Sequence, residues 1–160
     1  MPVISQRLGN LLGFSASPNL VSLADGEAKP LGEVDNTSLK YPNAYVSLSI
    51  AASAALPYDG AIELYFLSCI DTAGGKWSDD INPDTTSDVE ASIANAKLIS
   101  PSLKADTDLS SKNIVWVCND LAKEVGDLPS KWTLIVYNKT GQVLRSSGHK
   151  AVYQLKSYQS

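Results

Sequence analysis

The sequence predicts an all-β protein, an antiparallel β-sandwich of the jelly-roll or immunoglobulin-like kind with an N-terminal arm and one or two short helices. Short apolar runs with a period of two recur along the chain, and turn-forming residues separate them. No long helical pattern lies between successive runs, which argues against a parallel sheet with crossover helices. The chain has 160 residues and is 44% hydrophobic, which suits one domain around one core. We therefore expect an arm over residues 1–19 and a sandwich domain over residues 20–160.

The arm carries a few apolar anchors and is poorly placed to fold alone. Leu8, Leu11 and Leu12 fit one short helical turn with Ile4 on the same side, while glycine and proline residues interrupt any longer helix. Such an arm packs either on its own domain or on a neighbouring molecule. The candidate partner-binding residues are the apolar residues of the arm and one tryptophan further along the chain: Ile4, Leu8, Leu11, Leu12, Phe14 and Trp77.

Apolar runs between turn signals give the expected strands. They lie over residues 19–24, 28–34, 43–52, 61–70, 97–100, 113–119, 131–138, 142–146 and 150–158. The first of them ends at the turn Asp25-Gly26. The second is weak, because Pro30 and Gly32 interrupt it.

Two of these runs are the clearest. In residues 43–52, Val46, Leu48 and Ile50 alternate with small or polar residues, which is typical of a strand buried on one face. Residues 61–70 form the most apolar run in the chain, so we expect that strand near the centre of a sheet.

Helical structure is expected in two short places. A long polar excursion over residues 71–88 leads into a helix of about two turns over residues 88–95. Ser87 is the expected N-cap, and Glu90 completes a capping box with it. A connector over residues 120–130 has room for one more helical turn.

The C-terminal part reads as strands joined by a tight loop. Residues 131–138 alternate in a strand-like way, and residues 139–141 supply a glycine-containing hairpin loop. Residues 142–146 are expected to pair back. In the last strand, Val152 and Leu155 are the expected core contacts.

Charge and hydropathy exclude two classes of partner. The formal net charge is −4, and lysine and arginine residues are scattered singly rather than gathered in a stripe, so nucleic acid is not expected as a partner. No apolar run approaches the about 20 residues that span a membrane, so no membrane is expected either. The N-terminus lacks the pattern of a secretion signal, which favours synthesis in the cytoplasm.

The inventory of reactive residues argues against an enzyme. The single histidine, His149, stands in a turn, and neither a Gly-x-Ser-x-Gly motif nor a phosphate-binding loop is present. Cys69 and Cys118 each lie in an apolar run and are expected to be buried thiols. No cysteine or histidine cluster suits a metal, and we expect no cofactor.

The polar excursion over residues 71–88 leaves alternatives open. It contains the aspartates Asp71, Asp79, Asp80, Asp84 and Asp88. Three roles are open for them: a solvated acidic loop, a Ca²⁺ site, or the acid pair of a glycosidase. Trp77 is either a surface anchor for a sugar or a protein, or a pin that holds the loop to the core.

Two stretches carry a resemblance to a known family. Residues 62–71 (IELYFLSCID), with the following loop 74–77 (GGKW), and the stretch 128–141 (LPSKWTLIVYNKTG) resemble small β-sandwich virion proteins of tailed bacteriophages. The resemblance covers about residues 44–158 and describes a β architecture rather than a chemistry. It transfers no catalytic residue.

The resemblance implies a capsid decoration, or cement, protein, or a neighbouring head–tail component. Such a protein would be made in the host cytoplasm and located in the virion, with the major capsid protein or neighbouring virion proteins as partners. It would be a homotrimer, and the arm at residues 1–19 would clasp the shell. The alternative function is a carbohydrate- or receptor-binding module that uses the loop at residues 71–88.

Overall fold

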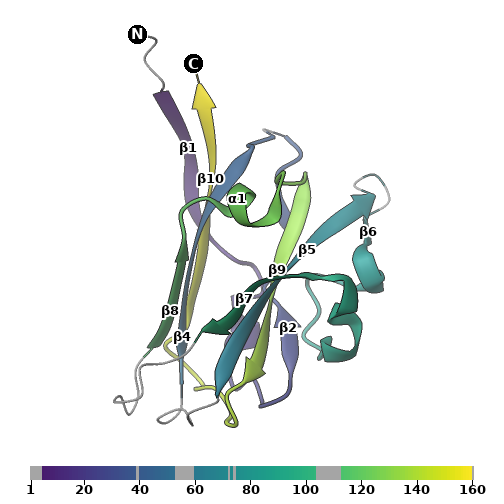
Figure 1. Cartoon of the computed structure of the whole chain (residues 1–160), viewed down its shortest axis with the longest axis vertical. Coiled ribbons are helices and arrows are strands. Elements are labelled where there is room, and N and C mark those ends of the chain that lie inside the picture. The colour runs from purple at the N-terminus through teal and green to yellow at the C-terminus, as the bar shows by residue number, and fades with distance from the viewer. Residues whose placement is uncertain are drawn as a thin grey trace.

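Two antiparallel β-sheets pack face to face around one main core (Figure 1). The structure is a computed structural model that describes residues 5–38, 40–52, 60–71, 73, 75–103 and 113–159. Its strands and short helical elements confirm the predicted all-β antiparallel sandwich.

The four-stranded sheet has the strand order β1-β10-β4-β8. Its strands are β1 (Ser5–Gly13), β4 (Asn43–Ala51), β8 (Asn113–Cys118) and β10 (Lys150–Gln159). The six-stranded sheet has the order β2-β9-β5-β6, with β3 also paired to β9 and β7 to β5. Its strands are β2 (Ala28–Pro30), β3 (Val34–Asp35), β5 (Ala61–Asp71), β6 (Lys76–Trp77), β7 (Lys97–Leu103) and β9 (Lys131–Lys139).

The helical elements are all short. Three are 3-10 helices, η1 (Ser17–Leu20), η2 (Ser78–Asp80) and η3 (Glu90–Asn95), and one is an α-helix, α1 (Leu121–Val125). The predicted turn within residues 120–130 is thus confirmed as α1. The Asp120 carboxylate caps it by accepting a hydrogen bond from the backbone N–H of Lys123 at 3.1 Å.

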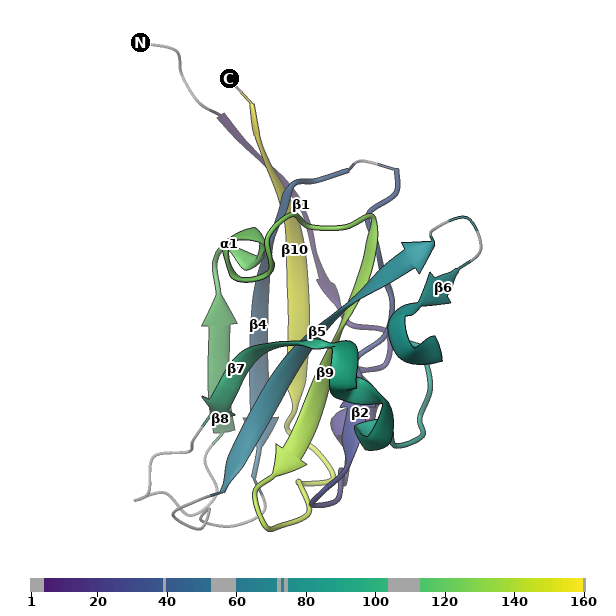
Figure 2. The same ribbon diagram turned by 45° about the vertical axis from the view of Figure 1, so that its right-hand side comes forward.

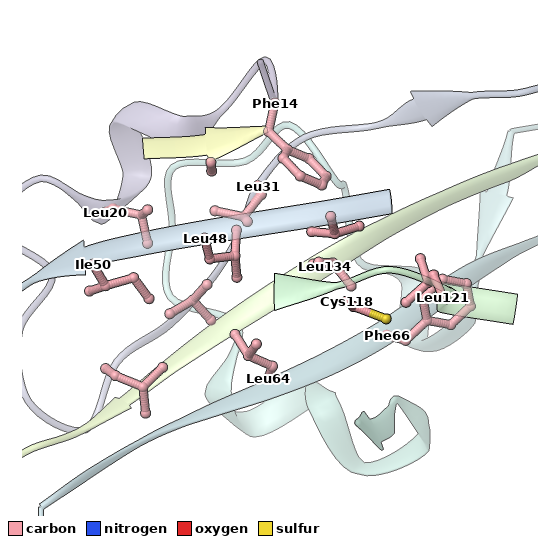
Figure 3. Close-up of a cluster of buried hydrophobic side chains, with 14 of the residues drawn as sticks. Phe14, Leu20, Leu31, Leu48, Ile50, Leu64, Phe66, Cys118, Leu121 and Leu134 are labelled. Atoms are coloured by element: carbon pink, nitrogen blue, oxygen red, sulfur yellow. The ribbon is translucent and has the colours of Figure 1, made fainter. Parts of the chain in front are cut away.

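The main core lies between the two sheets (Figure 3). Val46, Leu48 and Ile50 of β4 are fully buried there, as their alternation predicts. Leu64 of β5 and Leu134 of β9 meet them from the six-stranded sheet. Full burial of one such side chain stabilises the fold by about 1.5–3 kcal/mol, so this row of contacts holds the sheets together.

Trp132 of β9 is the centre of an aromatic group in this core. Its ring lies 6.0 Å from that of Phe14 and 5.8 Å from that of Phe66, measured between centroids. Tyr153 of β10 completes the group, with its ring 5.9 Å from Trp132 and 5.0 Å from Phe14. The aromatic rings therefore tie the segment after β1 to both sheets.

Three expectations about secondary structure are wrong. Residues 19–24 form η1 and turns instead of a strand, because the Asn19 amide donates hydrogen bonds to the carbonyl oxygens of Pro30 (2.8 Å) and Thr85 (2.7 Å) and so fixes a compact turn. Leu8, Leu11 and Leu12 lie in strand β1 instead of a helical turn, because β10 supplies a continuous edge that pairs with them. Residues 142–146 form only an isolated bridge between Ala52 and Leu144.

The helix start is also displaced. Ser87 does not cap η3; the Asp88 carboxylate instead accepts hydrogen bonds from the backbone N–H groups of Glu90 (3.0 Å) and Ala28 (2.8 Å). Both hydrogen bonds end on the same oxygen of Asp88, Oδ1, so this side chain connects the start of η3 to strand β2. In β10, Leu155 packs on the core as expected, whereas Val152 does not belong to it. Residues three apart in a strand lie on opposite faces, so both could not point inward.

Candidate interaction surface

The outer face of the six-stranded sheet is covered by the chain itself. The covering segment, residues 76–96, starts at the sheet edge with β6 and then passes over that face with η2 and η3 (Figure 2). A second cluster of buried side chains joins the two, and its members are Ala28, Leu67, Cys69, Trp77, Ile81, Val89, Ile93 and Ile135. Residues 78–88 of the predicted polar loop therefore belong, with η3, to a third layer.

Trp77 is buried in that layer. Its side chain is only 5% exposed, and its strand pairs with β5, where Cys69 lies opposite Trp77. Of the two roles considered for Trp77, the structure shows that of a pin on the sheet. The alternative of a carbohydrate platform thus has no exposed Trp77 ring to use.

The aspartates of this region are spread out, and Asp71, Asp84 and Asp88 accept hydrogen bonds from backbone N–H groups. An Asp71 oxygen accepts a hydrogen bond from the backbone N–H of Ala73 at 3.0 Å, and an Asp84 oxygen accepts one from the N–H of Glu33 at 3.3 Å. Asp79 and Asp80 lie in η2, and Asp80 has a left-handed backbone with φ 54°. Among the residues that the structure describes, no three carboxylate, thiol or imidazole groups come together to hold a metal ion. An open hollow of about 370 Å³ lies beside Glu33, Trp77 and Asp84.

The outer face of the four-stranded sheet has no such cover in the described parts of the chain. Val115 and Val117 of β8 are 61% and 49% exposed, and Leu11 of β1 is 55% exposed. The strand registers place these side chains on one face with alternate residues of β4 and β10. This surface, here named the open face, consists of Leu8, Leu11, Tyr45, Ser47, Ser49, Val115, Val117, Lys150, Val152, Gln154 and Lys156.

The open face differs in charge from the rest of the protein. None of the 17 acidic residues of the chain lies in β1, β4, β8 or β10. Its two cations lie towards the ends of β10: Lys150 pairs with Ser49, and the Lys156 ammonium lies 5.4 Å from the centroid of the Tyr45 ring. The centre of the face is therefore uncharged and largely apolar, which is typical of a contact surface.

Strand β1 forms an edge of this sheet. It pairs with β10 on one side, and no described strand pairs with its other side. The register shifts between Leu8 and Leu11, so that Gly9 and Asn10 face Leu155 in a β-bulge, and the Gln154 amide donates to the Gly9 carbonyl oxygen at 2.9 Å. The ribbon of β1 and β10 extends beyond the body of the sandwich (Figure 1).

The remaining partner-binding candidates divide into three cases. Leu12 is 46% exposed on β1 opposite Tyr153, on the inner side of the sheet. Phe14 is only 3% exposed and belongs to the aromatic group of the core. Ile4 lies outside the described residues. The division into an arm and a domain stays a prediction, although residues 5–13 pair with their own sheet.

A polar network on the other sheet satisfies itself. The Tyr65 hydroxyl donates to Glu63 at 2.8 Å, and the Lys139 ammonium donates to the same carboxylate at 3.2 Å. Burial, together with the hydrogen bond to Glu63, raises the pKa of Tyr65 to about 12. Tyr137 likewise donates to Glu90 at 3.2 Å. Each of these polar groups has a hydrogen-bond partner within the network, so the network acts as structural support between β5, β9 and η3.

The other reactive groups are also structural. Cys69 and Cys118 are free, buried thiols, as predicted, and burial raises the pKa of Cys118. His149 bridges two backbone segments: its Nδ1 accepts from the backbone N–H of Ala51 at 3.1 Å, and its Nε2 lies 2.8 Å from the carbonyl oxygen of Arg145. With Nδ1 as acceptor, Nε2 carries the proton and donates, which ties the loop before β10 to β4.

The two exposed valines of β8 are absent from the candidate residues that the sequence predicts. Residues 113–119 are an expected strand with an apolar centre, and the outward direction of Val115 and Val117 is not part of that expectation. The signal was available, because Ile114 and Cys118 share one face of a strand and Val115 and Val117 the other.

Comparison with known proteins gives no match. No protein-family model, no curated protein and no solved structure matches it. Within the described residues, no helix has the length and apolar character needed to cross a membrane.

Proposed function

We propose that the protein is a structural component of a tailed-bacteriophage particle, a capsid decoration protein that binds the outer surface of the head and bridges shell subunits. The resemblance of residues 44–158 to small β-sandwich virion proteins supports the phage setting. The free edge of β1, with three leucines about half exposed along it, is the observation that carries the proposal. No catalytic step is involved, because bridging stabilises a shell by mass action through buried interface.

The edge of β1 offers backbone groups to an incoming strand. Phe14 donates its N–H to the carbonyl oxygen of Ala151 in β10 at 3.2 Å. Because backbone groups in an antiparallel pair alternate in direction, the N–H of the preceding residue, Gly13, points to the free side. A strand from a shell subunit that pairs there gains main-chain hydrogen bonds and contact with the leucine side chains.

A test of the edge of β1 needs a substitution that leaves the core packing unchanged. Deletion of residues 1–18 would also remove Phe14, which is buried against Trp132, so loss of binding could reflect loss of fold. Gly13→Pro removes only an amide on the free side. Gly13→Ala is the matched control, because a Cβ at this position meets nothing closer than the Ala151 carbonyl oxygen at 3.9 Å.

The experiment measures binding to empty heads of the phage that encodes the chain, stripped of this protein. Wild type and Gly13→Ala should bind, and Gly13→Pro should bind about tenfold more weakly or worse, which corresponds to about 1.4 kcal/mol. Absence of the chain from purified particles, or equal binding of all three proteins, would contradict the proposal.

A further inference from the structure

We propose that the free edge of β8 is a second strand-binding site, which takes an extended, uncharged segment of a neighbouring shell subunit and seats one of its apolar side chains in a hollow beside Trp116. The choice of a shell subunit as the partner rests on the proposed function, because a protein that bridges two subunits needs two contacts. The edge of β1 supplies one contact, and β8 lies at the opposite margin of the same sheet.

The backbone of β8 offers hydrogen-bonding groups to its free side. Ala51 of β4 donates its N–H to His149, which precedes β10, at 3.1 Å, so the backbone groups of Ala51 point away from β8. In an antiparallel pair, two opposite residues direct these groups either towards each other or both away. Asn113 lies opposite Ala51, and it therefore directs its groups away from β4. Every second residue does the same, which includes Val115 and Val117.

β8 lacks the features that protect the edges of the other sheet. Charged residues, prolines and very short strands normally block an exposed edge, since an unblocked edge pairs with other chains. In the six-stranded sheet, β2 ends in Pro30, β7 contains Lys97 and Pro101, and β3 and β6 have two residues each. β8 has six residues, Asn113–Cys118, and none of them is charged, proline or glycine. No described strand pairs with its free side. Such an edge is typical of a strand that another chain completes.

A hollow of about 330 Å³ at this edge provides a place for a side chain. Trp116 and Cys118 from the inner face of β8 line it, together with Ile99 of β7 and with Val117 from the outer face. Because both faces of the strand contribute, the hollow lies at the edge of the sheet. In an added strand, the residues opposite Trp116 and Cys118 point inward as these two do, so one of them enters the hollow.

The charges around the hollow favour an uncharged occupant. Asp120, Lys123 and Glu124 line it, and the nearby Lys156 ammonium donates to the carbonyl oxygen of Asn119 at 3.1 Å. The two carboxylates and the two ammonium groups balance one another. A charged side chain that entered the hollow would leave water without a surplus of opposite charge to meet it, whereas an apolar side chain has no such cost.

Amide hydrogen exchange tests the strand pairing without any substitution. The wild-type chain is compared free in solution and bound to empty heads of the phage that encodes it, stripped of this protein. In the free chain, the Val115 and Val117 amides should exchange quickly, because they face the free side, and the Trp116 amide should exchange slowly, because it faces β4. On the heads, exchange at Val115 and Val117 should slow at least about tenfold. Unchanged exchange at both amides in the bound chain would overturn the proposal.

A substitution separates the two edges. Val117→Pro removes an N–H on the free side of β8, and Val117→Ala is the matched control that keeps it. At saturation, wild type and Val117→Ala should raise the temperature at which the heads break down. Val117→Pro, with a circular dichroism spectrum like that of wild type, should still bind through β1, about tenfold more weakly, and should leave that temperature unchanged, because it holds one subunit instead of two.

The outcomes distinguish this site from the proposed function. A folded Val117→Pro that stabilises the heads as wild type does would overturn only the second site. Absence of wild-type binding to the heads would overturn the proposed function and this contact with it. If Val117→Pro does not fold, the exchange of the Val115 and Val117 amides in wild type decides alone.

Discussion

The outer faces of the two sheets carry similar side chains but lie in different surroundings. On β5, Leu67 points outward and is 1% exposed, because the covering segment packs over it. On β1, Leu11 also points outward and is 55% exposed. The chain thus supplies a third layer on one side only. The contrast teaches that an outward apolar residue in a sandwich is a core residue or a contact residue according to what the rest of the chain places over it.

The largest expected effect is on the covered side. Trp77→Ala should lower the free energy of unfolding by about 3–5 kcal/mol, because it leaves a large void between the covering segment and β5. Lys76→Ala, an exposed neighbour in the same strand, is the control and should change it by less than about 0.5 kcal/mol. Urea denaturation of dilute protein measures both. A small effect of Trp77→Ala would mean that the tryptophan is a surface anchor after all.

A matched pair of leucines tests the contrast directly. Leu67→Ala should cost about 2–5 kcal/mol, whereas Leu11→Ala should cost less than about 1 kcal/mol in protein too dilute to associate. The measurement is again the free energy of unfolding. Similar costs for the two leucines would show that the outer faces do not differ as described.

The attachment of the covering segment should depend on Asp88. Its carboxylate accepts hydrogen bonds from the N–H groups of Glu90 and Ala28, so Asp88→Ala should cost about 1–3 kcal/mol. Ser87→Ala should cost less than about 0.5 kcal/mol, because Ser87 is exposed and does not cap η3. The reverse order of the two costs would restore Ser87 as the cap.

The smallest effect is a dependence on pH at the margin of the covering segment. The pKa of Tyr65 is raised to about 12 from an ordinary value of 10.0, so the folded state holds the phenolic proton more tightly than the unfolded state. This stabilisation is complete below pH 10 and is lost as the pH rises through about 12. Tyr65→Phe should therefore lose less stability than wild type over that range, and Glu63→Gln should be intermediate. Identical alkaline unfolding profiles would contradict this.

The sequence allowed some levels of this structure to be predicted and not others. Period-two patterns identified β4, β5 and β9, because inward residues such as Leu48 and Leu64 must be apolar. The covering segment was missed because its four anchoring residues are spaced irregularly among polar ones, and only the tertiary fold brings Trp77 beside Val89 and Ile93. Residues 19–24 were misread because the side chain of Asn19 bonds to Pro30 and Thr85, contacts that no local pattern encodes.

The candidate site was predicted only in part. Leu8, Leu11 and Leu12 are exposed, as a contact role requires, but they lie on a strand. Phe14 and Trp77 are buried instead. The sequence could not show this, because an aromatic side chain among polar residues packs in a core as readily as it binds at a surface. Val115 and Val117 became candidates only when the sheet order placed them on the same face as Leu8 and Leu11.

One measurement tests the central claim, that the chain covers the outer face of one sheet and leaves that of the other exposed, most directly. It is the rate at which a hydrophilic thiol reagent labels Val117→Cys and Leu67→Cys in dilute protein, with Ile70→Cys, 65% exposed on β5, as the control; Cys69 and Cys118 are buried in all three variants. Val117→Cys should be labelled at about the rate of Ile70→Cys, and Leu67→Cys at least about tenfold more slowly, because the covering segment must open first. Equal labelling rates for Val117→Cys and Leu67→Cys would contradict the account.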